Sequence, residues 1–232
     1  GYKDIPADRM GPRLRLKDSL DQIFAEKLPG VVDSVESKVF GIGAESYTVG
    51  SHEFCMGYVM SQNKDHIILT LDTGHYHPTE VVSAKLSSVF AFMDSVLLHV
   101  SRPIRWDSDH VVAFDDETRA IMDELVRLGK LENTYIATDF FDASINRIVA
   151  WVTGLRNTRK AMLNALLQPV DTMKALEAKG DLSARLAYAQ EFKAMPFSLV
   201  WDYYCAKQNA SVGLEWLEQI QKYEKDVLSK RK

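Results

Sequence analysis

The chain has little of what several classes of protein need. It contains only two cysteines, Cys55 and Cys205, which lie far apart and outside any Cys-x-x-Cys pair. This excludes a disulfide framework and a thiolate metal site, and it is typical of a reducing cytoplasm. No apolar run approaches the roughly 20 residues that cross a bilayer, and the sequence opens without the pattern of a secretory leader. We therefore expect a cytoplasmic protein with no membrane partner.

Charge of one sign is also scarce. The formal net charge is −4, and acidic and basic residues are interspersed along the 232 residues. A basic stripe with interleaved aromatic residues, as nucleic-acid-binding proteins carry, is missing. We expect no nucleic-acid partner, and a small molecule or another subunit instead. An apolar fraction of 46% suffices for a substantial core in one large domain or two small ones.

Strands and helices alternate in the first part of the chain. Apolar periodicity predicts strands over 31–39, 66–72, 95–101 and 134–140, and helices over 12–28, 51–61, 82–90 and 115–128. The strand over 66–72 is nearly all apolar, as in a parallel sheet that is buried on both faces. The alternation predicts an α/β fold with a parallel sheet covered by helices.

The second part of the chain is predicted to be helical throughout. Helices are expected over 144–154, 157–168, 172–179, 181–194, 197–207 and 212–229. The last of these carries one apolar stripe and is expected to pack on the sheet or on a neighbouring subunit. We therefore divide the chain into residues 1–143, which carry the sheet, and a helical extension over 144–232.

Side chains that can bind metal ions lie where the predicted strands end. Glu36, Asp72, His99 and Asp139 lie at or near these ends, and His75, Asp107 and Asp109 lie in the loops that follow. Because the carboxyl ends of parallel strands meet at one edge, we expect these side chains to converge on one spot. Burying so many carboxylates together is unfavourable unless cations neutralise them. The pattern therefore predicts a site for divalent metal ions.

Each residue by itself has a simpler interpretation. A single aspartate after a strand is more often a turn former or a helix cap, and a lone histidine in a strand is usually a hydrogen-bonded core residue. The tripeptide of residues 107–109 is, in isolation, more often a solvated turn. Carboxylates and histidines recur at successive strand ends, and this recurrence favours a metal site. The many oxygen ligands suit Mn²⁺, Mg²⁺, Co²⁺ or Zn²⁺.

The candidate ligands can be divided between two ions. Glu36, Asp72, His99 and Asp139 could hold one, and His75, Asp107 and Asp109 the other, with Asp72 bridging both. Lys38 follows Glu36 by two residues and faces the same side of the predicted strand. It could bring a positive charge to the edge of the substrate, or it could simply pair with a neighbouring carboxylate.

Long motifs around these residues resemble one known family. The segments VESKVFGIGAESYTVG (35–50), LDTGHYHPTE (71–80), LHVSRPIRWDSDH (98–110) and TDFFDASINR (138–147) closely resemble bacterial L-rhamnose isomerase. The resemblance runs from the first residue to the last. It implies a (β/α)8 barrel with an extra helical region, of which this chain would contain the last four strand-helix units, and a homotetramer in the complete enzyme.

The resemblance also implies an activity in rhamnose catabolism. The family interconverts L-rhamnose and L-rhamnulose, and the expected course is a 1,2-hydride shift assisted by two metal ions, with Mn²⁺ expected first and Zn²⁺, Co²⁺ or Mg²⁺ as alternatives. An enediol route with a carboxylate base is the competing chemistry. The family's structural metal is held at positions matching Glu36, Asp72, His99 and Asp139, and its catalytic metal at those matching His75, Asp107 and Asp109. Lys38, Asp107 and Asp109 are the expected catalytic residues.

The family's chains are considerably longer, and the additional part precedes Gly1. A complete barrel takes about 250 residues, and half a barrel leaves sheet edges unpaired. The sequence is expected to be an excerpt or truncated form, although a partner polypeptide or two associating halves could also close the barrel. Little activity is expected from the chain alone. The alternatives are a non-catalytic association module, another metal-dependent sugar isomerase, and a two-metal phosphoesterase on a similar barrel.

Overall fold

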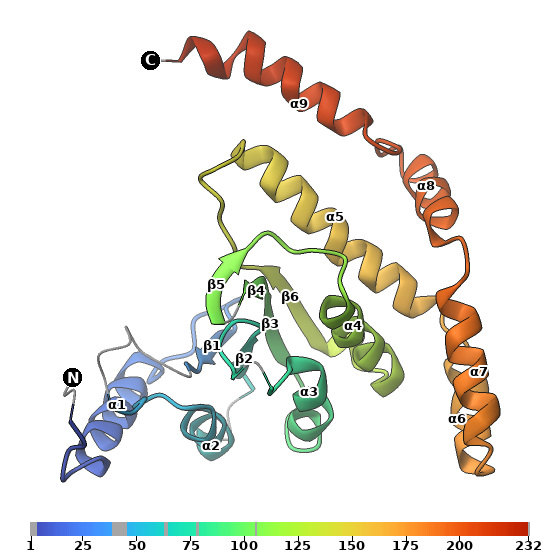
Figure 1. The fold of residues 1–232 in the computed structure, drawn as a ribbon. Coiled ribbons are helices and arrows are strands. Elements are labelled where there is room, and N and C mark those ends of the chain that lie inside the picture. Colours follow the sequence, from blue (N-terminus) through green and yellow to red (C-terminus); the bar gives the residue numbers. More distant parts are fainter. Residues whose placement is uncertain (1–3, 39–45, 63–64, 78, 105, 232) are drawn as a thin grey trace. The chain divides into compact units, whose positions relative to one another are not determined.

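The computed structural model describes residues 4–38, 46–62, 65–77, 79–104 and 106–231. Within these residues the centre of the fold is a parallel sheet with strands in the order β1-β2-β3-β6 (Figure 1). The predicted α/β class with a parallel sheet is therefore confirmed. The strands are β1 (Asp33–Glu36), β2 (Ile67–Asp72), β3 (Val96–Val100) and β6 (Thr134–Thr138).

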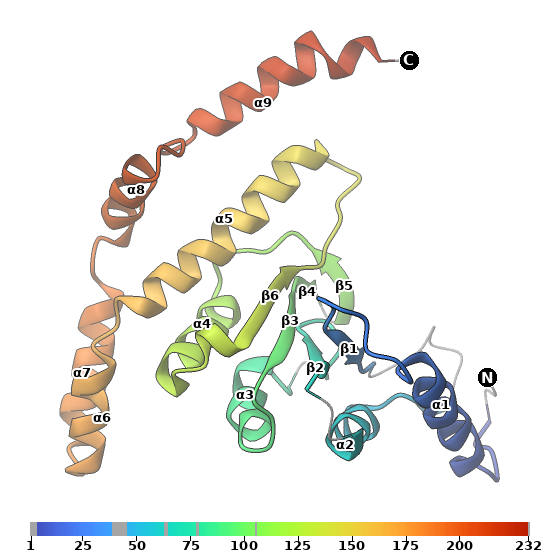
Figure 2. The ribbon, with the colours of Figure 1, turned by 180° about the vertical axis from the view of Figure 1, so that it is seen from behind.

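Helices connect the strands, as parallel pairing requires, because a parallel neighbour can be reached only by a crossover. Figures 1 and 2 show α2 and α3 on the same face of the sheet. The helices of this part of the chain are α1 (Met10–Ile23), α2 (His52–Gln62), α3 (Val82–Phe90) and α4 (Asp116–Leu128).

The central strand β2 is the most buried part of the sheet. All of its residues are buried, as the sequence predicts, and Leu69 and Leu71 are completely inaccessible to solvent. Leu98 of β3 and Leu86 of α3 are equally buried. This apolar packing fixes the positions of the strand ends that carry the candidate ligands.

The first helix is shorter than predicted. It ends at Ile23 instead of residue 28, and Ile23 and Leu28 are 67% and 57% exposed. The chain leaves the helix at Phe24, whose buried ring packs against Tyr58 of α2 with 6.3 Å between ring centroids. Residue 39 of the predicted first strand and residues 41–45 of the predicted loop lie outside the described residues.

The prediction of a loop around Asp107 and Asp109 is wrong, because this segment forms a strand. An antiparallel pair joins β4 (Arg102–Ile104) and β5 (Trp106–His110). The Ser108 hydroxyl accepts a hydrogen bond from the Ile104 amide at 2.7 Å and donates to the Ile104 carbonyl at 3.2 Å. The pair is short and polar, so it lacks the apolar alternation by which a strand is found in sequence.

The chain divides into two compact units. One contains residues up to 112 together with 124–141, and the other contains 113–123 together with the residues from 142 onward. In the described part of the second unit, helices follow one another and end in a short 3-10 turn, Leu228–Lys230. These helices are α5 (Arg147–Leu166), α6 (Val170–Ala178), α7 (Leu182–Lys193), α8 (Phe197–Lys207) and α9 (Glu215–Asp226).

The helices predicted over 144–154 and 157–168 are in fact one helix, α5. Asn146 caps its start by accepting hydrogen bonds from the amides of Ile148 and Val149. Gly154, which the sequence suggested as an end, is a buried interior residue, and its carbonyl accepts a hydrogen bond from the Thr158 hydroxyl at 2.9 Å. Within the described residues, no helix combines the length and apolarity that crossing a membrane requires.

Candidate metal centre

Strand register brings the predicted ligands to one edge of the sheet. Asp72 at the end of β2 pairs with His99 of β3, and Glu36 ends the neighbouring strand β1. Asp139 directly follows β6, and its amide donates to the Val100 carbonyl at 3.1 Å. The carboxyl ends of the four parallel strands therefore each present a polar side chain at the same edge.

Four of these residues form what we call the strand-end cluster: Glu36, Asp72, His99 and Asp139. Ligand atoms of the first three lie within 4.8 Å of one another, a spacing that a single metal ion could bridge. His99 is the hub of the cluster. Its Nδ1 atom lies 2.9 Å from Glu36 Oε1, 3.6 Å from Asp72 Oδ2 and 3.5 Å from Asp139 Oδ2.

A second group, the hairpin cluster, consists of His75, Asp107 and Asp109. His75 Nε2 lies 3.1 Å from Asp107 Oδ1 and 3.8 Å from Asp72 Oδ1. His75 Nδ1 also lies 3.5 Å from Glu36 Oε1, so the two clusters are contiguous. The carboxylate of Asp109 interacts electrostatically with Asp107 and Asp72. Contacts within 4 Å thus join all the predicted ligands except Asp109, which acts on the others through its charge.

Lys38 supplies a positive charge to the hairpin cluster. Its Nζ atom lies 2.7 Å from Asp107 Oδ2 and 2.5 Å from His75 Nε2. The Lys38 side chain is 44% exposed, whereas that of His75 is 4% exposed. The ion pair with a neighbouring carboxylate, which the sequence left open as the alternative for Lys38, is present in the structure, and the role toward substrate stays a prediction.

Burial and mutual repulsion shift the pKa values of the site. Burial raises the pKa of Asp109, and the nearby carboxylates of Asp107 and Asp72 raise it further. Burial also acts to raise the pKa of Asp72, but His99 and His75 outweigh it and leave that pKa lowered. The carboxylates of Asp72 and Glu36 raise the pKa of His99 to about 10. The site therefore strongly favours positive charge.

Three supporting residues were not recognised in the sequence. Gly74 lies under the hairpin: its carbonyl accepts from the Asp107 amide at 2.9 Å, and an added Cβ would lie 3.4 Å from the Asp107 Cα atom. Thr73 and Ser101 join the ends of β2 and β3 through Thr73 Oγ1, which donates to the Ser101 carbonyl at 3.0 Å and accepts from the Ser101 amide at 2.9 Å. Only the position of these small residues directly after the strands could have indicated such a role.

Among the residues that the structure describes, three buried polar atoms in the two clusters have no hydrogen-bond partner. They are Asp72 Oδ2, His75 Nδ1 and Asp109 Oδ1. Unsatisfied buried carboxylate oxygens are costly, and a divalent cation can satisfy them. Mixed carboxylate and imidazole donors suit Mn²⁺ or Zn²⁺. The residues present therefore fit metal ions.

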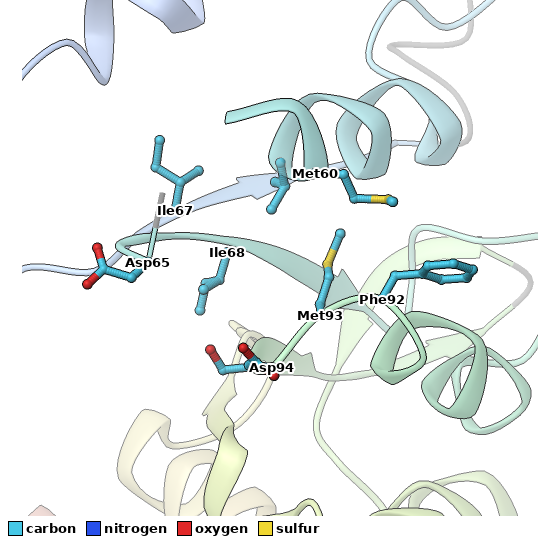
Figure 3. A pocket seen from close by; sticks show the side chains of 9 residues that line it. Met60, Asp65, Ile67, Ile68, Phe92, Met93 and Asp94 are labelled. Atoms are coloured by element: carbon cyan, nitrogen blue, oxygen red, sulfur yellow. The ribbon is translucent and has the colours of Figure 1, made fainter. Parts of the chain in front are cut away.

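A cavity lies at the other end of the strands. Its volume is about 390 Å³, and its lining includes Ile67 and Ser95, which lie at or next to the starts of β2 and β3. In Figure 3 the side chain of Met93 points toward the helix that carries Met60. Active sites in parallel α/β folds lie at the carboxyl ends of strands, so this cavity is not the candidate site.

Fold and site together define an α/β protein with a candidate cation centre at the carboxyl ends of a parallel sheet. The model of the L-rhamnose isomerase (RhaA) family matches residues 1–231, and the chain belongs to this family. It is 54% identical over 233 residues to L-rhamnose isomerase of Citrobacter koseri and 53% identical to those of Salmonella paratyphi B and Salmonella newport. Each match covers 100% of this chain and 55% of the relative, so the chain spans about half the length of these relatives.

Proposed function

We propose that this chain provides the metal centre of an aldose-ketose isomerase that interconverts L-rhamnose and L-rhamnulose. The observation that carries the proposal is the contiguity of two ligand clusters around the buried carboxylate of Asp72, which is 1% exposed. Residues 1–143 would form the last four strand-helix units of a (β/α)8 barrel. Residues 144–232 would be its helical extension. Family membership supports both assignments.

The two clusters would hold two divalent cations with different tasks. The strand-end cluster would hold a structural ion, and the hairpin cluster a catalytic one, with Asp72 close to both. Mn²⁺ is our first candidate, and Zn²⁺, Co²⁺ or Mg²⁺ could replace it. Cations bound here would polarise the carbonyl group and the adjacent hydroxyl group of an open-chain sugar, and would lower the pKa of that hydroxyl.

The protein side chains would manage charge and protons in the reaction. Isomerisation moves a hydrogen with its electron pair from C2 to C1 of the sugar, while a proton moves from O2 to O1. The Lys38 ammonium group would stabilise the negative charge that develops at O1. Asp109, whose pKa is raised by burial and by its acidic neighbours, is suited to accept and return the transferred proton. Asp107, whose Oδ1 lies 3.1 Å from His75 Nε2, would hold the catalytic ion together with His75.

The complete enzyme is proposed to be a cytoplasmic homo-oligomer, with a tetramer as the expected state. Exposed apolar side chains on the second unit support self-association. On α8, Leu199 and Tyr203 are 67% and 65% exposed, and on α5 Trp151 is 48% exposed. Apolar groups of this size are depleted from free surfaces and enriched in interfaces.

The test is ketose formation from L-rhamnose. For this test, the part of the Citrobacter koseri relative that the match does not cover is fused to the N-terminal side of Gly1. We call this fusion protein the completed chain. After chelation and addition of Mn²⁺, the completed chain should form L-rhamnulose, and the 232-residue chain alone should form little or none. A metal-loaded, folded completed chain that produces no ketose would refute the proposal.

The hydrogen-transfer route can be tested in the same assay. Run in deuterated water, a 1,2-hydride shift should leave C1 of the product without solvent deuterium. Extensive incorporation at C1 would favour the enediol route instead. In that case Asp109 would act as the base that removes hydrogen from carbon, and the substrate assignment would stand unchanged.

A further inference from the structure

Lys38 occupies the donor atoms that the hairpin cluster would offer to a cation. Its ammonium group lies 2.5 Å from His75 Nε2 and 2.7 Å from Asp107 Oδ2. An ammonium group can only donate hydrogen bonds, so in this contact His75 Nε2 accepts through its lone pair, and the 3.1 Å between that nitrogen and Asp107 Oδ1 is then a close contact and not a hydrogen bond. A metal ion bound to that nitrogen would need the same lone pair. The Lys38 ammonium group and a metal ion therefore cannot both use His75 Nε2 at the same time.

The charges in the hairpin cluster also indicate that Lys38 and a metal ion compete. The Lys38 ammonium group already compensates one carboxylate of the hairpin cluster. A divalent ion at these donors would lie within a few ångströms of that ammonium group, and like charges at such a distance repel. The strand-end cluster differs, because among the described residues its carboxylates pair with the imidazoles of His99 and His75 and with no lysine or arginine.

The Lys38 side chain can leave without disturbing the fold. Its backbone amide is anchored independently, by a 3.1 Å hydrogen bond to the Gly50 carbonyl. The side chain is 44% exposed and has a flexible four-carbon stem. Moving the ammonium group away from His75 therefore requires only side-chain rotation.

Resting on the proposed function, we propose that Lys38 is an internal competitor for the second cation: its ammonium group holds the donor atoms of His75 and Asp107 and weakens metal binding there. Displaced from these donors, the same ammonium group becomes free to pair with an oxygen of the sugar. Lys38 would thus couple occupation of the hairpin cluster to its own availability for substrate.

The test is a titration of Lys38→Met with Mn²⁺. Calorimetry measures the heat of binding, and electron paramagnetic resonance measures the concentration of free Mn²⁺. Methionine keeps much of the side-chain volume and removes the charge. The weaker of the two Mn²⁺ binding phases should tighten at least about tenfold, because a nearby like charge is removed. Asp109→Asn should weaken or abolish that phase, which assigns it to the hairpin cluster.

Two control variants separate competition from general effects of charge. Lys38→Arg keeps the positive charge and should stay within about threefold of the unmodified chain. Lys17→Met removes an exposed lysine that pairs with Asp21 at 2.6 Å, away from the site, and should leave both phases unchanged. Circular dichroism of each variant checks that it is folded.

The titration is run in the 232-residue chain and in the completed chain, so that a folding failure of the shorter form does not decide the outcome. An unchanged or weaker second phase in Lys38→Met would overturn the competition and leave the proposed function standing. Absence of Mn²⁺ binding by the folded, unmodified completed chain would overturn both. Tightening in Lys38→Met, with both controls unchanged, supports the competition.

Discussion

The two ligand clusters differ in how the chain supports them. Most members of the strand-end cluster lie on strands whose register is fixed by parallel pairing, as between Asp72 and His99. The hairpin cluster depends on a short antiparallel pair and on one backbone contact, from the Asp107 amide to the Gly74 carbonyl. Asp109 has a φ of 39°, a conformation that non-glycine residues adopt rarely. The first cluster is therefore part of the scaffold, and the second is held locally.

The difference suggests a division of labour. Sites on regular strands keep their geometry, whereas locally held sites can change their contacts at moderate cost. The side chains of the hairpin cluster also span a wide range of exposure, from 4% for His75 to 34% for Asp107. A substrate needs access and some adjustment, so the hairpin cluster is the more suitable place for the reaction.

The largest effect is expected at Asp72, which belongs to the strand-end cluster and lies 3.8 Å from His75 of the hairpin cluster. Asp72→Asn keeps the oxygen that accepts from the Gly74 amide at 2.7 Å but loses the negative charge. Both cations should bind more weakly, and kcat/KM of the completed chain should fall at least about 1000-fold. Equilibrium dialysis with Mn²⁺ and a ketose assay measure this. Loss of one cation only would show that Asp72 serves a single cluster.

A smaller and more selective loss is expected in the hairpin. Asp109→Asn removes a carboxylate whose Oδ1 atom is buried and has no hydrogen-bond partner in the described part of the chain. We expect kcat/KM to fall about 100-fold or more, because a proton carrier is lost, with a change in melting temperature of less than about 2 °C. Asp107→Asn should behave similarly.

The matched control is Asp116→Asn, which changes a fully exposed aspartate on α4 with no place in either cluster. Its turnover should equal that of the unmodified chain. Near-normal turnover in Asp109→Asn and in Asp107→Asn would mean that the chemistry does not take place at the hairpin.

The strand-end cluster could be found in the sequence, but the support of the hairpin could not. Apolar runs locate strands well, and a charged residue at the end of such a run is conspicuous, as Asp72 is after β2. The hairpin strands are short and polar, and their pairing depends on the Ser108 hydroxyl and on the small size of Gly74. Such contacts are tertiary, so periodicity carries no signal of them.

The length of α5 was mispredicted for a related reason. Gly154 reads as a helix end in a local window, since glycine weakens helices and often follows their last turn. In the fold this position is buried, and burial of the helix on both sides of it outweighs the local preference. Helix ends that depend on packing cannot be placed from local propensity alone.

Metal removal should affect stability through the strand-end cluster more than through the hairpin. A cation at about 100 times its dissociation constant stabilises the folded state by about 2.7 kcal/mol. For a chain of this size, that corresponds to a rise in melting temperature of roughly 5–10 °C. The rise on addition of Mn²⁺ after chelation should be largely lost in His99→Gln and largely kept in Asp109→Asn. The reverse pattern would exchange the structural and catalytic assignments.

The smallest effect concerns the packing next to His75, where the Tyr76 hydroxyl and His52 Nδ1 share a 3.2 Å hydrogen bond. Burial, and then the positive charge of Lys85, lower the pKa of His52 in the folded state below its ordinary value of 6.5, against the opposing carboxylates of Glu53 and Glu80. The unfolded chain therefore takes up this proton first. The contribution of His52 to stability is complete above pH 6.5 and declines as the pH falls below it.

His52→Gln should remove this dependence. The melting temperatures of the unmodified chain and the variant should differ by about 1–2 °C more or less at pH 5.5 than at neutral pH, a small change because His52 is only partly buried. The affinity for Mn²⁺ should not change. An equal pH dependence in both proteins would refute the assignment to His52. A loss of Mn²⁺ affinity in His52→Gln would show that the hairpin cluster relies on the packing next to His75, and that its support extends beyond the contacts around Gly74.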